Sequence, residues 1–194
     1  MRDATMMPKL VERLDEQAVL SITTGPLTLS ATCVREMMTG VPNAPIDGLK
    51  NFNMGHPGGF DPWLLAAASE QHSVGMIGSY VMGNMYGDAS NIEFINTFEG
   101  HADYYDGDRA TGDILEQWLV DGRHNVIAAH FSGPDKVGHK WGTVSEEYRN
   151  KMLDMDQHLS SLLRFVPANW TVVVTADHGM TASGSHGSAE ADTR

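Results

Sequence analysis

Residues 171–180 read TVVVTADHGM, and residues 184–187 read GSHG. The β-branched apolar run in the first stretch follows a turn signal and predicts a buried strand. That strand ends at the adjacent pair Asp177 and His178, and His186 follows in a loop of Gly and Ser. A carboxylate and imidazoles held at a strand end are ligands that a divalent transition metal such as zinc binds. This part of the chain therefore predicts a metal site at one edge of a sheet.

A second group of ligand-type side chains follows a predicted strand at residues 125–131. The sequence continues as SGPDKVGHK, in which Asp135 and His139 are four residues apart. If a helical turn starts there, both side chains lie on the same face and can reach one ion. A helix cap followed by a surface histidine is the alternative interpretation of this motif taken alone.

A hydroxyl stands at the start of a predicted helix at residues 30–39. Ser30 occupies the position of an N-cap, and Gly40 occupies the position of the C-terminal stop. The positive end of a helix dipole favours a phosphate or a deprotonated nucleophile. Taken alone, Ser30 is better explained as a helix cap, because caps far outnumber nucleophiles.

The order of the predicted elements indicates an α/β fold in a single domain, residues 1–194. Strands are expected at residues 18–23, 74–81, 125–131 and 171–176, and helices at 8–17, 30–39, 61–72, 111–120 and 145–166. Alternating strands and helices predict a mainly parallel sheet covered by helices on both faces. Ligands of such sheets bind beyond the carboxyl ends of the strands. The three groups of polar residues each follow a predicted strand, so we expect them to meet at one edge.

The segment 82–110 gives no clear pattern. It contains His101 and three aspartates, Asp103, Asp106 and Asp108, without the spacing of a calcium-binding EF-hand loop. We expect a solvated acidic loop here.

Composition limits the classes of function. The 194 residues include 25 acidic and 13 basic ones, for a formal net charge of −12, and there is one cysteine, Cys33. No basic groove of the kind that binds nucleic acid is expected. An anionic substrate would need locally bound cations, which a metal site supplies. No apolar run approaches the length of a membrane helix.

Together the candidates provide one hydroxyl, two or three carboxylates and three histidines. Five ligands are too many for one tetrahedral ion but suit two. Two divalent ions can activate a nucleophile and stabilise a leaving oxygen, as phosphoryl or sulfuryl transfer requires. We expect Ser30 to attack as an alkoxide and form a covalent intermediate.

These motifs resemble those of the alkaline phosphatase superfamily. The branch is that of type I phosphodiesterases, nucleotide pyrophosphatases and glycosylphosphatidylinositol ethanolamine phosphate transferases. Residues 177–187 resemble its DHGM…GSHG motif, and residues 131–140 resemble its LGLDHxGHK segment. Residues 28–40 resemble its nucleophile segment, in which Ser30 stands nine residues before Thr39. Residues 41–53 look closest to the ethanolamine phosphate transferases.

The resemblance implies an alkaline-phosphatase-like core with two zinc ions. One ion would be bound by Asp135, His139 and His186. The other would lie beside the nucleophile and be bound by Asp177 and His178. A phosphoester or phospholipid-linked substrate is implied, as is a catalytic domain on the lumenal or extracytoplasmic face of a membrane.

Two features of this branch bear on the completeness of the site. A loop Asn often holds the phosphoryl oxygens, and Asn51 or Asn53 matches it. The second zinc ion has a further Asp in a D-G/A-x-R segment on the first strand, and nothing in this chain matches that segment. We therefore expect a fragment of a catalytic domain, truncated at both ends, that binds one metal ion better than the other.

Two alternatives remain open at this point. The first is a non-catalytic metal-binding fragment or degenerate module of the same fold, which the unmatched Asp favours. The second is a sulfatase or phosphomonoesterase. Sulfatases of the formylglycine type need C/S-x-P/A-x-R, which neither Ser30 nor Cys33 begins.

Overall fold

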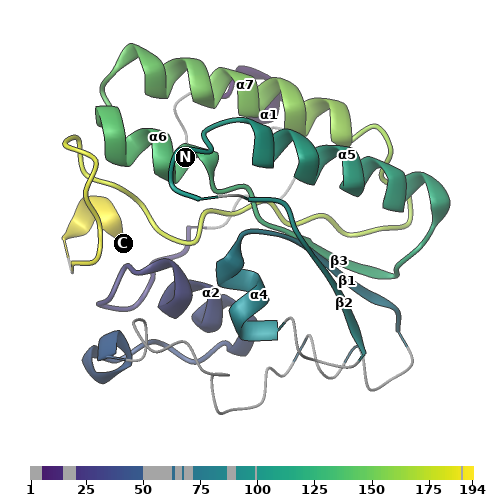
Figure 1. Cartoon of the computed structure of the whole chain (residues 1–194), viewed down its shortest axis with the longest axis horizontal. Coiled ribbons are helices and arrows are strands. Elements are labelled where there is room, and N and C mark those ends of the chain that lie inside the picture. Colours follow the sequence, from purple (N-terminus) through teal and green to yellow (C-terminus); the bar gives the residue numbers. More distant parts are fainter. Residues whose placement is uncertain are drawn as a thin grey trace.

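The computed structural model describes residues 6–14, 21–49, 63, 67, 72–86, 91–98, 100–188 and 190–194. Its centre is a sheet of three parallel strands in the order β2-β1-β3. The strands are β1 (Val74–Gly78), β2 (Ile92–Asn96) and β3 (Val126–Ala129). Helices lie on both faces of this sheet (Figure 1). The predicted α/β fold with a parallel sheet is therefore confirmed.

The helices form one layer on each side of the sheet. On one side lie α2 (Ser30–Thr39) and α4 (Tyr80–Tyr86). On the other side lie α5 (Asp106–Asp121), α6 (Gly133–Trp141), α7 (Glu146–Leu162) and α1 (Pro8–Leu14) (Figure 1). Two short 3-10 helices complete the described elements, η1 (Pro45–Leu49) and η2 (Ala191–Thr193).

The main core lies between the sheet and the layer of α2 and α4. Every residue of β1 is buried, as expected for a central strand with a neighbour on each edge and helices over both faces. Met76 of this strand packs in a cluster with Val34 of α2, Met82 and Tyr86 of α4, and Ile92 of β2. This core holds the start of α2, and with it Ser30, beside the sheet.

A smaller apolar cluster joins α1 to α7. Met7, Leu10 and Met155 are its buried members. The side chain of Asp156 accepts hydrogen bonds from the backbone N–H groups of Lys9 and Leu10, at 3.1 and 2.8 Å. The first N–H groups of a helix have no carbonyl partner within the helix, and Asp156 supplies an acceptor for two of them in α1.

The strand predicted at residues 171–176 is wrong. This segment has no regular secondary structure, and Val172, Val173 and Val174 are 47%, 79% and 39% exposed. An apolar β-branched run becomes a strand only when another strand edge offers its N–H and C=O groups. Within the described part of the chain, no strand pairs with these residues.

Other predicted boundaries also differ from the structure. Residues 21–23, the described part of the strand expected at 18–23, have no regular structure. The strand expected at 74–81 ends at Gly78, and α4 begins at Tyr80. Gly78 has φ +141°, and a Cβ there would lie 2.6 Å from the carbonyl oxygen of His130, so the strand ends at a position restricted to glycine.

The segment 82–110 is more ordered than the sequence indicated. It contains β2, and α5 begins at Asp106, five residues before the predicted start. Asp106 and Asp108 lie in the first turn of this helix, where the dipole favours carboxylates. The expected loop is therefore wrong for both residues, and solvation is wrong for Asp108, which is fully buried, whereas the Asp106 side chain is exposed.

Two predicted helices are confirmed with small shifts at their ends. The helix expected at 145–166 is α7, and the Ser145 hydroxyl caps it by accepting the N–H of Tyr148 at 3.1 Å. Gly40 ends α2 in the left-handed conformation, as predicted. Most of the helix expected at 61–72 lies outside the described residues. None of the described helices is long and apolar enough to cross a membrane.

Candidate functional site

Asp135 and His139 lie on consecutive turns of α6. Pro134 stands in the first turn of this helix, where its missing N–H has no cost, and Gly142 follows its last residue. The Nε2 atom of His139 is 3.5 Å from Oδ1 of Asp135. The predicted i, i+4 arrangement is therefore present, and both side chains face the same point.

His186 reaches this point from the C-terminal loop. Its Nε2 atom lies 3.4 Å from Oδ1 of Asp135 and 2.9 Å from Nε2 of His139. One ligand atom from each of the three residues lies within 4.8 Å of the others, which is compatible with binding one metal ion. The helix brings two of these ligands together, and the loop adds the third.

Backbone carbonyls fix the orientation of both imidazole rings. Nδ1 of His139 donates to the carbonyl oxygen of Gly184 at 2.9 Å, and Nδ1 of His186 donates to that of Thr28. A carbonyl oxygen only accepts, so each Nδ1 carries the proton and each Nε2 presents a lone pair. Metal-binding histidines are commonly held by this type of hydrogen bond.

The centre of the cluster therefore lacks positive charge. Two imidazole lone pairs and Oδ1 of Asp135 face one another, and this buried oxygen has no hydrogen-bond donor among the described residues. Such an arrangement is stable only with a cation between the groups, either a proton or a metal ion. The donor set of two imidazoles and one carboxylate fits zinc.

The pKa values of this cluster reflect the same need for a cation. Burial disfavours the charged His186 ring, but the contact with Asp135 and the bond to the Thr28 carbonyl outweigh it and raise the pKa of His186. Burial also opposes ionisation of Asp135, yet His186 and His139 lower the pKa of Asp135.

Ser30 lies beside His178 at the edge of this cluster. The side chain of Ser30 makes no capping hydrogen bond to α2, since Leu29 is the capping residue and Ser30 the first helical one. The carbonyl oxygen of Gly179 accepts from Nδ1 of His178 at 2.9 Å, so Nε2 of His178 presents a lone pair. The Ser30 hydroxyl lies 3.2 Å from that Nε2 and donates to it.

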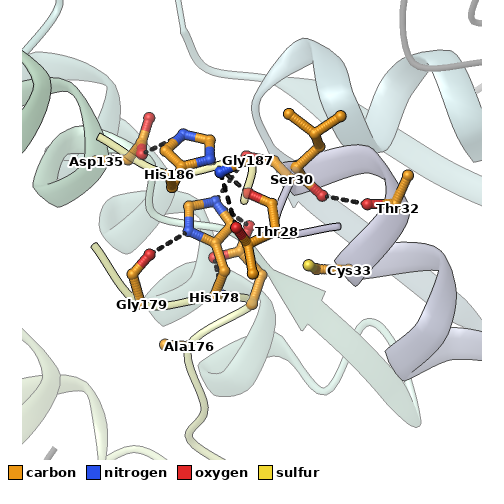
Figure 2. Close-up of polar contacts among 12 residues, drawn as sticks. Thr28, Ser30, Thr32, Cys33, Asp135, Ala176, His178, Gly179, His186 and Gly187 are labelled. Carbon is orange, nitrogen blue, oxygen red and sulfur yellow. Dashed lines mark hydrogen bonds and ion pairs between the residues drawn. The ribbon is translucent and has the colours of Figure 1, made fainter. Parts of the chain in front are cut away.

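Asp177 completes this second group. Its Oδ2 atom is 3.5 Å from Nε2 of His178, and its Oδ1 atom accepts the backbone N–H of His178 at 3.0 Å. The rings of His178 and His186 are stacked with centroids 4.0 Å apart (Figure 2). The two groups of ligand-type side chains are therefore adjacent, and Ser30 lies on the side of the second group.

All six predicted residues of the catalytic and metal groups meet in this region: Ser30, Asp135, His139, Asp177, His178 and His186. They do so without a strand at residues 171–176 before Asp177, and the described residues 21–23 before Ser30 have no regular structure either. Asn51 and Asn53, predicted to bind the substrate, lie outside the described residues.

Two further residues contribute to the site and were not singled out from the sequence. Thr28 is fully buried, and its hydroxyl accepts the N–H of Gly187 at 2.7 Å and donates to the carbonyl of Ser188 at 3.0 Å. The backbone carbonyl of Thr28 accepts the hydrogen bond from Nδ1 of His186. His130 follows β3, and its Nδ1 lies 2.8 Å from the Ser79 hydroxyl. Only its position directly after a strand could have indicated His130.

The surroundings of His130 change the pKa of its ring. Burial lowers the pKa of His130, against the opposing influence of the nearby carboxylates, first Asp177 and then Asp108 and Asp135. The ring is therefore neutral near neutral pH.

Comparison with known proteins gives a family match. The sequence profile of the family described as "Type I phosphodiesterase / nucleotide pyrophosphatase" matches residues 44–191. This range contains the five ligand-type residues of the two groups, and Ser30 precedes it.

Several curated relatives are similar over parts of the chain. The catalytic subunit of GPI ethanolamine phosphate transferase 3 of Homo sapiens is 38% identical over 85 residues, which are 42% of this chain and 8% of the relative. GPI ethanolamine phosphate transferase 2 of Debaryomyces hansenii is 30% identical over 116 residues, 54% of this chain and 13% of the relative.

A third relative is similar over almost the whole chain. GPI ethanolamine phosphate transferase 2 of Yarrowia lipolytica is 23% identical over 205 residues, which are 97% of this chain and 23% of the relative. The chain thus spans less than a quarter of the length of each of the three relatives.

Proposed function

The chain belongs to the type I phosphodiesterase/nucleotide pyrophosphatase family, and from this premise we propose that it forms the catalytic site of a metal-dependent phosphotransferase. The reaction is transfer of a phosphoryl-containing group from a phosphodiester through Ser30. The observation that carries the proposal is the 3.2 Å distance between the Ser30 hydroxyl and Nε2 of His178, next to a group of three metal-type ligands.

The first metal ion is assigned to Asp135, His139 and His186. Three observations support this assignment. The Nδ1 atoms of both histidines donate hydrogen bonds to backbone carbonyls, and the lone pairs of both Nε2 atoms face Asp135. Oδ1 of Asp135 has no hydrogen-bond donor among the described residues. A second ion is assigned to Asp177 and His178. Divalent ions supply positive charge, which lowers the pKa of a neighbouring hydroxyl or water and stabilises phosphoryl oxygens.

The reaction proceeds in two displacements at phosphorus. In the first, Oγ of Ser30 forms a bond to phosphorus, and the bond from phosphorus to the leaving-group oxygen breaks. A metal ion held by Asp177 and His178 would take the Nε2 lone pair that the Ser30 hydroxyl faces, so the hydroxyl proton would pass to solvent water before the attack, and solvent would return a proton to the leaving-group oxygen. In the second, an acceptor alcohol or water forms the new bond to phosphorus, and the bond to Oγ breaks, which regenerates the serine.

The transferred group is ethanolamine phosphate, and the donor is a phospholipid-linked phosphodiester. This substrate is proposed from the names of the relatives, which are GPI ethanolamine phosphate transferases. Asn51 or Asn53 would bind the phosphoryl oxygens. With a net charge of −12, the chain depends on bound cations to attract such an anion.

Two measurements test this function. The zinc-loaded chain should release p-nitrophenol from a p-nitrophenyl phosphodiester, and Ser30→Ala should reduce that rate by at least about 10³-fold, the scale of losing a nucleophile. The zinc content of Ser30→Ala, measured by atomic emission, should equal that of the wild type. Undiminished turnover in Ser30→Ala would exclude the assignment of Ser30.

A non-catalytic metal-binding role is the second candidate. It is favoured by the unequal number of ligands, since three residues converge at Asp135 but only Asp177 and His178 lie beside Ser30 among the described residues. This candidate predicts stoichiometric zinc binding without turnover. The same assay on the chain with an N-terminal extension separates an incomplete catalytic site, which would gain activity, from a binding module, which would not.

A further inference from the structure

A fully buried ion pair connects α5 to α7 close to the proposed metal site. Nζ of Lys151 lies 2.6 Å from Oδ2 of Asp108, and neither side chain is exposed. Nζ is also 3.5 Å from Oδ2 of Asp154 and 4.4 Å from the centroid of the Tyr105 ring. Two charges removed from water in this way do not readily stabilise a fold better than apolar side chains would.

The second oxygen of Asp108 reaches a third helix. Its Oδ1 atom accepts the backbone N–H of Gly133 at 3.2 Å, and Gly133 is the first residue of α6. The first N–H groups of a helix have no partner within the helix, and Ser132, which precedes α6, makes no capping bond with its side chain. Asp108 therefore caps α6 from a distance of 25 residues in the sequence.

Gly133, the first residue of α6, packs tightly against the ion pair of Asp108 and Lys151. A Cβ at Gly133 would lie 2.2 Å from Oδ2 of Asp108, 2.6 Å from the carbonyl oxygen of Tyr104 and 2.7 Å from Cε of Lys151. The helix therefore has little freedom to slide or rotate at this end. Asp135 and His139, two of the three ligands of the first proposed ion, lie two and six residues further along the same helix.

We propose that Asp108 is a positioning residue that orients α6, so that Asp135 and His139 meet His186. Asp108 acts through the Gly133 N–H, and Lys151 lies 2.6 Å from the buried carboxylate and offsets its charge. The proposal rests on the proposed function, since it assigns Asp108 to the metal site of that function.

Two double variants separate positioning from fold stability. Asp108→Asn/Lys151→Met removes both charges and keeps an oxygen that can accept the Gly133 N–H. Asp108→Leu/Lys151→Met removes the charges and that acceptor. Because neither variant leaves a buried unpaired charge, both should fold, which far-UV circular dichroism and urea unfolding will check.

The readout is Co²⁺ binding, followed by its visible absorption. Asp108→Asn/Lys151→Met should bind Co²⁺ within about threefold of the wild-type affinity, whereas Asp108→Leu/Lys151→Met should bind at least about tenfold more weakly, the usual effect of losing a residue that supports ligands. The visible band of the weaker variant should also change in intensity, since a distorted site changes the cobalt spectrum. Equal affinity and spectra in the two variants would overturn the proposal.

A measurement on the wild-type protein keeps the proposal testable if a variant does not fold. Saturating Zn²⁺ should slow hydrogen exchange of the Gly133 amide by a larger factor than that of the Met82 amide, which bonds to the Ser79 carbonyl at 3.0 Å in the opposite layer. Equal factors would overturn it. Failure of the wild type to bind Co²⁺ or Zn²⁺ would instead contradict the proposed function.

Discussion

His139 and His186 are 47 residues apart in the sequence, and their Nε2 atoms lie 2.9 Å from each other. The ring of His139 is held by the backbone carbonyl of Gly184, in the loop that carries His186, and the ring of His186 is held by the carbonyl of Thr28. Two imidazole lone pairs so close together repel unless a cation lies between them. This pair is the clearest structural indication that the region is built for a positive ion.

Removal of His186 should abolish tight metal binding. Since His186 provides one of three ligands, His186→Ala is expected to weaken Co²⁺ binding by more than about 100-fold, beyond the effect of losing a supporting residue. Isothermal titration calorimetry measures the affinity. The matched control is His101→Ala, since His101 is an exposed histidine that precedes α5. This variant should bind Co²⁺ as the wild type does. Equal affinities would show that the ion binds elsewhere.

Gly184 should be intolerant of any side chain. It has φ +81°, and a Cβ would lie 2.0 Å from the carbonyl oxygen of Gly138 on α6. Gly184→Ala should lower the free energy of unfolding by about 1–3 kcal/mol and also weaken Co²⁺ binding, because the loop would move away from His139. Urea unfolding and cobalt titration give both quantities.

Gly100→Ala is the control for backbone strain. Gly100 has φ +85°, and no atom lies within 4 Å of its added Cβ. This variant should lose stability through strain alone and keep its cobalt affinity. If Gly100→Ala and Gly184→Ala have the same effect on metal binding, the contact between the loop and α6 does not position His186.

The stability of the protein should decrease in mildly acidic solution because of His124. This ring is buried against Trp118, with centroids 4.4 Å apart, and its Nδ1 lies 2.7 Å from the Ser73 hydroxyl. Burial lowers the pKa of His124, and the nearby Glu93 only partly opposes this. The unfolded chain therefore takes up a proton near pH 6.5 that the folded protein does not, so stability is lost as the pH falls below that value.

The measurement is urea unfolding from about pH 7 to about pH 5, a range that spans the ordinary histidine pKa. His124→Gln, which cannot titrate, should lose less stability over this range than the wild type. Parallel slopes in the two proteins would contradict the assigned role of His124.

Cys33 should be chemically inert in the folded protein. Burial, and then the charge of Asp177, raise the pKa of its thiol to about 12. Since only the thiolate reacts with Ellman's reagent, the folded protein should react very slowly at about pH 8, where an ordinary thiol reacts readily. The protein in urea should react with one equivalent, and rapid reaction before unfolding would be the contrary result.

The sequence was sufficient for the parts of the site that depend on local geometry. Asp135 and His139 could be placed together because both lie on one helix, four residues apart. The position of His186 depends on a loop that crosses to Thr28, so only the resemblance to a family assigned it to the same ion. From its position alone, the hydroxyl of Ser30 was more simply explained as a helix cap, whereas in the structure it makes no capping bond and lies 3.2 Å from Nε2 of His178.

The failures of prediction involve contacts between distant residues. The run 171–176 has the composition of a strand, but pairing requires a partner edge, and none of the described strands provides one. Asp108 was expected in a solvated loop, since most carboxylates are exposed. Its partner Lys151 is on another helix, in a position that the apolar stripe of α7 does not reveal.

The most direct test of the central claim is detection of the group transferred to Ser30. The zinc-loaded chain is incubated with p-nitrophenyl phosphoethanolamine, stopped with acid and digested for mass spectrometry. We predict that the peptide containing Ser30 gains the mass of one phosphoethanolamine group, and that Ser30→Ala shows no such adduct. Turnover of the substrate with the adduct on another residue, or with the same adduct in Ser30→Ala, would contradict the account.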